Sequence, residues 1–221
     1  MTLTRIVGDI HGGFNEYSFF TLGVGRTRHA TDPAPPMRSV QVGDFGIGFH
    51  SPYWHNSVND WMEKNPDHRF IRGNHDDPAM CKTMKNYIAD GTVEGDVMYI
   101  GGAWSIDHAY RTEGKDWWRD EELSVMEFDR LAKIYEETKP RVMITHDCPT
   151  TVAWEMFLSK GLGLSGAPQI KTRTGEYLQH MFEMHQPELW FFGHWHHTKC
   201  MAINGTEFRC LGEQDYVDVD L

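Results

Sequence analysis

Five short apolar runs in this chain each end in polar side chains that are able to bind metal ions. The runs cover residues 3–8, 39–42, 69–72, 141–145 and 189–192, and the polar residues that follow them are Asp9 and His11, Asp44, Asn74 and His75, His146, and His194 and His196. In open α/β sheets, ligands bind outside the carboxyl ends of the strands. The repeated pattern therefore predicts an α/β fold that brings these side chains to one edge.

The segments between these runs carry helical spacing, further β patterns or turn residues. Helices are expected over 15–22, 52–64, 120–137, 150–158 and 169–185, and β structure over 92–94, 97–102 and 104–106. Loops are expected over 23–36 and 161–166, and a hairpin turn at 204–205. Because the 221 residues contain no repeat or linker, we expect a single domain over 1–221.

The cysteine pattern indicates free thiols. A hairpin at 204–205 sets Cys200 opposite Arg209 and Cys210 opposite Lys199, so these two cysteines are offset and no disulfide is expected. The chain shows neither a secretory leader pattern nor an apolar run near 18 residues, so no membrane association is expected. These features favour a cytoplasmic protein.

The charge balance limits the kind of partner. The chain carries 21 basic and 32 acidic residues, a net charge of −11. Proteins that coat nucleic acid carry a basic surface, so an extended nucleic-acid interface is not expected. Nothing in the pattern requires an obligate protein partner. The 13 histidines instead direct attention to metal binding.

The polar residues at the run ends form a complete ligand set. Residues two apart at the end of a strand point the same way, so Asp9 with His11, and His194 with His196, each deliver two ligands to one side. The set holds two carboxylates, one amide and four imidazoles besides His75, enough for two adjacent ions that share a carboxylate. Nitrogen and oxygen ligands without thiolate suit Mn, Fe, Zn, Co or Ni.

The same residues resemble the ordered blocks of a known family, the calcineurin-like metallophosphoesterases. The matching blocks are Gly8-Asp9-Ile10-His11, Gly43-Asp44, Gly73-Asn74-His75-Asp76, Thr145-His146-Asp147 and Gly193-His194-Trp195-His196. The resemblance spans positions 8 to 196 and is nearest to small stand-alone bacterial and phage phosphoesterases. It implies a four-layer α/β/β/α sandwich with two metal ions at the sheet edge.

The resemblance also implies a role for each residue. It places the first ion on Asp9, His11, Asp44 and His196, and the second on Asp44, Asn74, His146 and His194. Asp44 then bridges the two ions, and manganese is the metal that the resemblance favours. His75 resembles the histidine that contacts the phosphate and protonates the leaving oxygen, so His75 and Asp44 are the expected catalytic residues, and Asn74 and His75 lie against the substrate.

These features predict a metal-dependent phosphoric ester hydrolase. We expect it to cleave phosphodiester or phosphoanhydride bonds in small nucleotide-like substrates through attack by a hydroxide that bridges the metals. A phosphomonoesterase acting on phosphoproteins is the first alternative, but Ile47 and Gly48 stand where that branch carries an acid and an arginine. A nuclease and a non-catalytic scaffold of the same fold are the others.

The segment 107–118 is the expected substrate-facing loop. It holds Arg111 beside Trp117 and Trp118, a combination that is able to contact phosphate and stack a base. The alternative is that the tryptophans only anchor the following helix. Among the remaining histidines, His108 and His197 are expected near the site. The others are expected mainly at the surface: His29, His50, His55, His68, His180 and His185.

Overall fold

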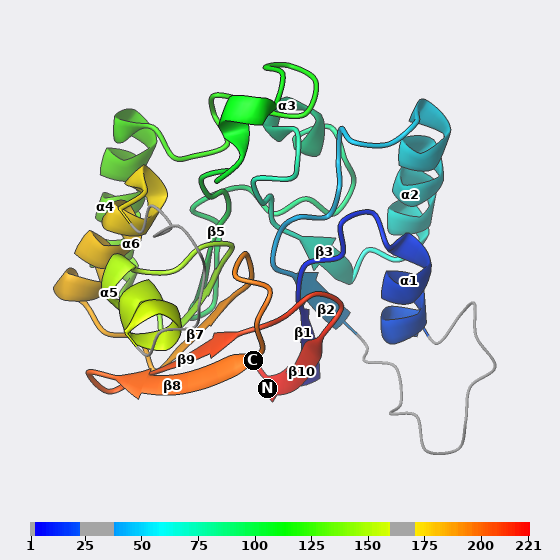
Figure 1. Ribbon diagram of the computed structural model, residues 1–221. Helices are drawn as coiled ribbons and strands as arrows, with labels where there is room; N and C mark the ends of the chain where they lie inside the picture. The colour runs from blue at the N-terminus through cyan, green and yellow to red at the C-terminus, as the bar shows by residue number, and fades with distance from the viewer. Residues whose placement is uncertain (1–2, 23–37, 160–170) are drawn as a thin grey trace.

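Two β-sheets lie back to back between two layers of helices (Figure 1). The structure is a computed structural model, and it describes residues 3–22, 38–159 and 171–221. The loops expected over 23–36 and 161–166, and His29, lie outside these ranges. The arrangement confirms the expected α/β fold and its four-layer order.

The described strands form one four-stranded and one six-stranded sheet. The first sheet, in the order β10-β1-β2-β3, contains β1 (Leu3–Val7), β2 (Arg38–Gln41), β3 (His68–Phe70) and β10 (Tyr216–Asp220). The second, in the order β4-β5-β6-β7-β9-β8, contains β4 (Val93–Glu94), β5 (Val97–Ile100), β6 (Val142–Thr145), β7 (Leu189–Phe192), β8 (Lys199–Ile203) and β9 (Thr206–Cys210). β1, β2 and β3 are parallel, as are β5, β6 and β7.

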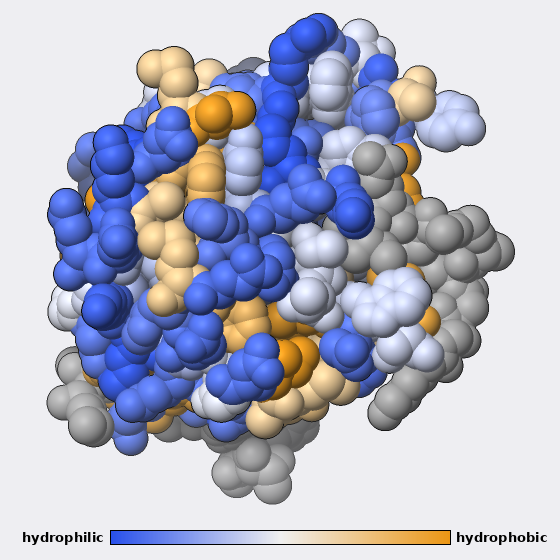
Figure 2. Space-filling view, turned by 90° about the vertical axis from the view of Figure 1, so that its left-hand side faces the viewer, coloured by the Kyte–Doolittle hydropathy of each residue, from blue (hydrophilic) through white to orange (hydrophobic). Residues whose placement is uncertain are grey.

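Helices cover the outer face of each sheet. The helical segments are α1 (Phe14–Leu22), α2 (Pro52–Lys64), α3 (Pro78–Cys81), the 3₁₀ turn η1 (His108–Tyr110), α4 (Val125–Thr138), α5 (Thr150–Ala153), the π-helical turn η2 (Trp154–Leu158) and α6 (Arg173–Met184). Helices α1 and α2 lie beside the first sheet, and α4, α5 and α6 lie beside the second (Figure 1). The outside of this second helical layer is largely hydrophilic (Figure 2).

Strand alternation divides the apolar side chains among three clusters. Ile144 of β6 packs between the sheets, whereas its neighbour Met143 packs toward α4 and α6. In the same way Ile6 of β1 faces the other sheet and Val7 faces the α1–α2 layer. Because successive strand residues point to opposite faces, each sheet has two buried surfaces, and this requires four layers.

Helix α4 begins later than the sequence pattern predicts. Ser124 accepts a hydrogen bond from the backbone N–H of Glu127, and the Glu127 side chain accepts one from the backbone N–H of Ser124, forming a capping box. This cap fixes the start at Val125 and leaves residues 120–123 as the end of the preceding loop. The helix ends where Lys139 adopts a left-handed conformation before Pro140.

One predicted strand is absent, and one strand was not predicted. Residues 104–106 form no strand, because the backbone N–H of Ser105 donates to the carboxylate of Glu121 rather than to a neighbouring strand. Strand β10 was not expected; it pairs antiparallel with β1, so Leu3 lies opposite Asp220. The hairpin was correct, since Cys200 lies opposite Arg209 and Cys210 opposite Lys199, and all four cysteines are free.

The expectation of surface positions was wrong for His55 and His68. Nε2 of His55 accepts a hydrogen bond from the backbone N–H of Gly48 at 2.8 Å. Nδ1 of His68 lies 3.0 Å from the hydroxyl oxygen of Ser39. Both imidazoles are buried because each one satisfies a polar partner inside the fold.

Candidate metal centre

The carboxyl ends of five strands meet where the two sheets adjoin. Four side chains there form a first donor group, and their ligand atoms all lie within 4.8 Å of one another: Asp9, His11, Asp44 and His196. Nε2 of His196 lies 3.1 Å from Nε2 of His11 and 3.3 Å from Oδ2 of Asp9. This is the set that the resemblance assigns to the first ion.

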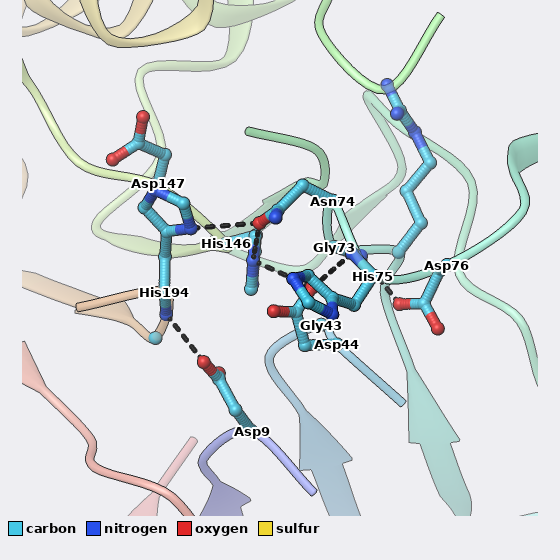
Figure 3. Close-up of polar contacts among 12 residues, drawn as sticks. Asp9, Gly43, Asp44, Gly73, Asn74, His75, Asp76, His146, Asp147 and His194 are labelled. Atoms are coloured by element: carbon cyan, nitrogen blue, oxygen red, sulfur yellow. Dashed lines mark hydrogen bonds and ion pairs between the residues drawn. The ribbon is translucent and has the colours of Figure 1, made fainter. Parts of the chain in front are cut away.

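A second donor group adjoins the first (Figure 3). Oδ1 of Asn74 lies 3.0 Å from Nε2 of His146 and 2.9 Å from Nδ1 of His194. Oδ1 of Asp44 lies 3.1 Å from the same His146 nitrogen. These four side chains are those that the resemblance assigns to the second ion.

Asp44 lies between the two donor groups. Its Oδ1 faces His146, and its Oδ2 lies 3.8 Å from Nε2 of His11. The backbone N–H of His75 also donates to Oδ1 at 2.7 Å. One carboxylate thus presents a different oxygen to each group, which is the arrangement a bridging ligand requires.

Glycines before the ligands allow this crowding. A Cβ at Gly73 would lie 2.0 Å from Oδ1 of Asp44, and one at Gly193 would lie 2.1 Å from Oδ1 of Asp9. No side chain fits at such distances, so only glycine lets the backbone pass this close to the carboxylates. The glycines in the sequence blocks therefore have a packing reason.

Four of the candidate ligands have strained backbones. The φ angles are 44° at His11, 57° at Asp44, 65° at His194 and 53° at His196. Residues other than glycine rarely adopt a positive φ, and such strain is typical of functional sites that the surrounding structure holds in place.

Hydrogen bonds fix which imidazole nitrogens face the site. Nδ1 of His146 lies 2.8 Å from the carbonyl oxygen of Val42, which only accepts, so this nitrogen carries a proton and Nε2 is the nitrogen that faces the site. Nδ1 of His196 contacts the carboxylate of Glu213 at 3.0 Å and leaves its Nε2 directed at Asp9. The Nε2 atoms of His146 and His196 therefore face the second and the first donor group, respectively.

The donor groups fit divalent cations. Oδ2 of Asp9 faces Nε2 of His196 at 3.3 Å, and its Oδ1 is buried without a hydrogen-bond partner among the described residues. Burial disfavours both charges of the Asp44–His146 pair, but their attraction outweighs it, lowering the pKa of Asp44 and raising that of His146 to about 10. A positive charge placed between the ligands would stabilise the buried carboxylates of these donor groups.

Asp76 holds the loop after β2, a role in capping a turn for which the sequence does not identify the partners. Asp76 is fully buried and accepts from the backbone N–H groups of Phe45, Gly46, Ile47 and Gly73, at 2.7 to 3.1 Å. Burial above all, and then the neighbouring Asp44, raises its pKa to about 7. Its place after Asn74-His75 was the only available signal, and that signal does not identify its partners.

His75 lies beside the donor groups and contacts Arg111 of the segment 107–118. The guanidinium of Arg111 donates to Nε2 of His75 at 2.6 Å, so the proton of the neutral ring is on Nδ1. Burial foremost, and the Arg111 charge, lower the pKa of His75 to about 4 against the opposing effect of Asp44. On the other side, the ring of Phe49 stacks on His75 with centroids 5.5 Å apart.

The two tryptophans of the loop have different surroundings. Trp118 meets Phe49 edge-on at 5.4 Å and so adjoins His75. Trp117 is half-buried, and its ring lies 5.7 Å from the ring of His108. Of the two histidines expected near the site, His108 lies in this loop, and its Nδ1 contacts the carbonyl oxygen of Ser105. His197 is exposed near Phe157 and belongs to neither donor group.

The departure at Gly48 has a steric cause. A Cβ there would lie 2.6 Å from Cβ of Asp77 and 3.2 Å from the Trp118 ring, and the residue has a φ of 93°. The neighbouring Ile47 is fully buried. In this structure an arginine at position 48 would therefore collide with Asp77 and Trp118 and strain the backbone.

Several solved structures resemble this chain at low identity and with TM-scores below 0.5. A Staphylococcus aureus protein named as a 5′-nucleotidase has 13% identity and a TM-score of 0.48, covering 96% of this chain and 49% of its own, so this chain spans about half its length. The phosphopantetheinyl hydrolase of Mycobacterium tuberculosis has 14% identity and a TM-score of 0.46, covering 96% and 89%. GAP50 of Plasmodium, an inner membrane complex anchor, has 11% identity and a TM-score of 0.47, covering 97% and 73%. Similarity at this level says nothing about the activity of this chain.

A family model matches most of the chain, whereas no curated protein matches it. No helix among the described residues is both long enough and apolar enough to span a membrane. The family model described as calcineurin-like phosphoesterase matches residues 4–198, which include both donor groups. The chain therefore belongs to the calcineurin-like phosphoesterase family.

Proposed function

We propose that this chain, as a single domain over 1–221, is a two-metal phosphoesterase that hydrolyses phosphodiester or phosphoanhydride bonds in small nucleotide-like substrates. The observation that carries the proposal is the position of Asp44, which presents one oxygen to each of two adjoining donor groups. Family membership supports the reaction class, and the arrangement of the loop supports the class of substrate.

The two donor groups would hold the ions. The first ion binds Asp9, His11, Asp44 and His196, and the second binds Asp44, Asn74, His146 and His194. A pair of divalent ions supplies the Lewis acidity that activates a water molecule and neutralises charge on a phosphoryl group. The oxygen and nitrogen donors suit manganese, which we propose as the metal, and equally admit Fe, Zn, Co or Ni.

Arg111 and His75 form the phosphate-binding side of the site. Arg111 lies on the loop between β5 and α4 and donates to His75, and its charge is balanced by Asp107 at 2.8 Å. A guanidinium is the side chain best suited to phosphoryl oxygens, so Arg111 supplies the cation that Gly48 does not. His75 donates from Nδ1 as it stands, and from Nε2 only after Arg111 moves away.

The aromatic side of the site favours a nucleotide over a phosphoprotein. Phe49 and Trp118 extend from His75 as a continuous aromatic contact, which suits stacking of a base. The arginine and acid of the phosphoprotein phosphatase branch are replaced by Gly48 and buried Ile47. The four free cysteines support a reducing compartment, and we infer a cytoplasmic enzyme that has no obligate protein partner.

One substrate panel tests the proposal. The metal-free protein is loaded separately with Mn, Fe, Zn, Co or Ni and assayed on bis(p-nitrophenyl) phosphate, p-nitrophenyl phosphate and a series of nucleotides. We expect two bound ions per chain and the highest kcat/KM on a diester or nucleotide. A preference for p-nitrophenyl phosphate and phosphopeptides would show a phosphomonoesterase, and two bound ions without turnover would show a scaffold.

A further inference from the structure

The second donor group depends on which end of the Asn74 amide faces it. An asparagine side chain has an oxygen, which binds cations, and an NH₂ group, which does not. Oδ1 of Asn74 faces Nε2 of His146 and Nδ1 of His194 at 3.0 and 2.9 Å. If the amide turned around, it would place two hydrogens where an ion would bind.

The other end of this amide contacts a buried pair of residues. Nδ2 of Asn74 donates to Oγ of Ser105 at 3.2 Å. The Ser105 hydroxyl donates in turn to Oε2 of Glu121 at 2.6 Å, and the Ser105 backbone N–H donates to Oε1 at 2.8 Å. Ser105 is 1% exposed and Glu121 2% exposed, so bulk water does not compete for these bonds.

The direction of these bonds leaves one orientation for the amide. A hydroxyl has a single proton, and the proton of Ser105 is used by Glu121. Oγ of Ser105 is therefore only an acceptor toward Asn74, and it selects the NH₂ end. We propose that Ser105 and Glu121 are positioning residues that orient the Asn74 amide and so create the second ion site. This inference rests on the proposed two-metal function.

Glu121→Gln reverses the direction of the bonds without changing the shape. The Ser105 backbone N–H is a fixed donor, so the amide oxygen of the new side chain must face it. The new NH₂ group then donates to Oγ of Ser105, whose proton turns toward Asn74. That proton attracts Oδ1 of Asn74 and favours the turned amide, which repels a cation.

Asn74→Asp provides the matching test. A carboxylate has two equivalent oxygens and cannot be presented the wrong way round. Its inner oxygen needs a donor from Ser105, which Glu121 withholds and Glu121→Gln supplies. Glu121→Gln is therefore harmful beside Asn74 and harmless or helpful in the Asn74→Asp background.

A charge control separates orientation from simple electrostatics. Glu122→Gln removes the same charge from the adjacent position, where the carboxylate accepts from the backbone N–H of Thr174 and lies 3.8 Å from Arg173. Among the described residues its carboxylate forms no hydrogen bond with Ser105, so Glu122→Gln is expected to leave metal binding unchanged. Ser105→Ala removes the acceptor itself and is a second probe if Glu121→Gln folds poorly.

The experiment measures binding of Mn²⁺ alone to the full metal-free chain, by electron paramagnetic resonance of the free ion. Thermal unfolding of each metal-free variant verifies folding. We expect two sites in the starting protein and in Glu122→Gln. In Glu121→Gln and Ser105→Ala we expect at least tenfold weaker binding at one site, and in Asn74→Asp/Glu121→Gln no weakening relative to Asn74→Asp.

The outcomes distinguish the inference from the function on which it rests. If the starting protein binds fewer than two ions, both the two-metal proposal and the inference are overturned. If it binds two, and folded Glu121→Gln also binds two with unchanged affinity, only the inference is overturned. An equal loss from Glu121→Gln in both the Asn74 and Asn74→Asp backgrounds likewise overturns it, because charge alone then accounts for the effect.

Discussion

Among single residues, Asp44 is the one that both donor groups share. Its two oxygens face different groups, so replacing it affects both ions, whereas His196 belongs to the first group only. We expect Asp44→Asn to lose most bound metal and most activity, and His196→Ala to weaken chiefly the first ion. Metal analysis of the two purified variants tests this. Two ions per chain and near-normal turnover in Asp44→Asn would show that Asp44 is not a bridge.

His75 follows a candidate ligand but has its own contacts with Arg111 and Phe49. We expect His75→Asn to keep both ions and to slow hydrolysis of an alkyl or nucleotide ester by about 10²–10⁴-fold, the usual contribution of a general acid. A p-nitrophenyl ester should lose far less, because its leaving group departs without a proton. Kinetics on both esters, with metal analysis, provide the test.

Two results would change this interpretation of His75. Equal losses on both esters would mean that His75 holds the phosphate rather than donating a proton. Loss of metal would mean that His75, and not Asn74 alone, supports the second ion.

At the scale of elements, the loop from Gly101 to Ser124 places its two adjacent tryptophans in different surroundings. Trp118 adjoins the Phe49–His75 stack, so Trp118→Ala should lower kcat/KM on a nucleotide by about 5- to 150-fold, as expected for the loss of roughly 1–3 kcal/mol of stacking. It should change hydrolysis of a compact aryl phosphate little. An equal loss on both substrates would favour a packing role.

Trp117 is the matched control within the same loop. Since it packs by His108 and is half-buried, Trp117→Ala should lower the free energy of unfolding by about 1–2 kcal/mol, less than the loss of a fully buried aromatic side chain. The selectivity between nucleotide and aryl phosphate should stay the same. Urea unfolding and steady-state kinetics measure the two effects, and a nucleotide-selective loss would return Trp117 to the substrate site.

The loop after β2 depends on one carboxylate. Asp76→Ala leaves four buried backbone N–H groups without their acceptor, and each such group costs about 1–3 kcal/mol, so we expect at least 3 kcal/mol lost from the free energy of unfolding. Asp77→Ala removes only the cap of α3 and should cost about 1 kcal/mol. Urea unfolding in chelator compares them, and equal losses would show that Asp76 is not the main support of the loop.

At the scale of the whole molecule, the candidate ligands come from both sheets. Asp9, His11 and Asp44 follow strands of the first sheet, and His146, His194 and His196 follow strands of the second. The site exists only when the two sheets are packed together, so ions that bind there stabilise the folded state and not the unfolded one. At a hundredfold excess over Kd, each ion should add about 2.7 kcal/mol.

This stabilisation predicts a thermal shift. Removing the ions with a chelator should lower the Tm by about 5–10 °C per ion for a chain of this size. Calorimetry with and without Mn²⁺ measures the shift, and Asp44→Asn should show little of it. A Tm that is indifferent to chelator in the starting protein would contradict binding between the sheets.

The sequence by itself determined most of the strands and the candidate ligands that follow five of them. A strand repeats every two residues and a helix every 3.6, so local patterns identify both. Gly73 and Gly193 mark the points where the backbone passes close to a carboxylate, and Gly43 marks the point where it passes close to the His146 ring. The same local information predicted the register of the Cys200–Cys210 hairpin, because a two-residue turn fixes the pairing next to it.

Only the tertiary structure decided which polar groups meet and with which atoms. The bonds of Asp76 to Phe45, of Asn74 to Ser105 and of Arg111 to His75 join residues 31 to 36 positions apart, and the pairing of β10 with β1 spans nearly the whole chain. No local period encodes such partners, because they depend on how distant segments pack against each other. For the same reason, the adjacent Trp117 and Trp118 look alike in sequence but have different neighbours in the fold.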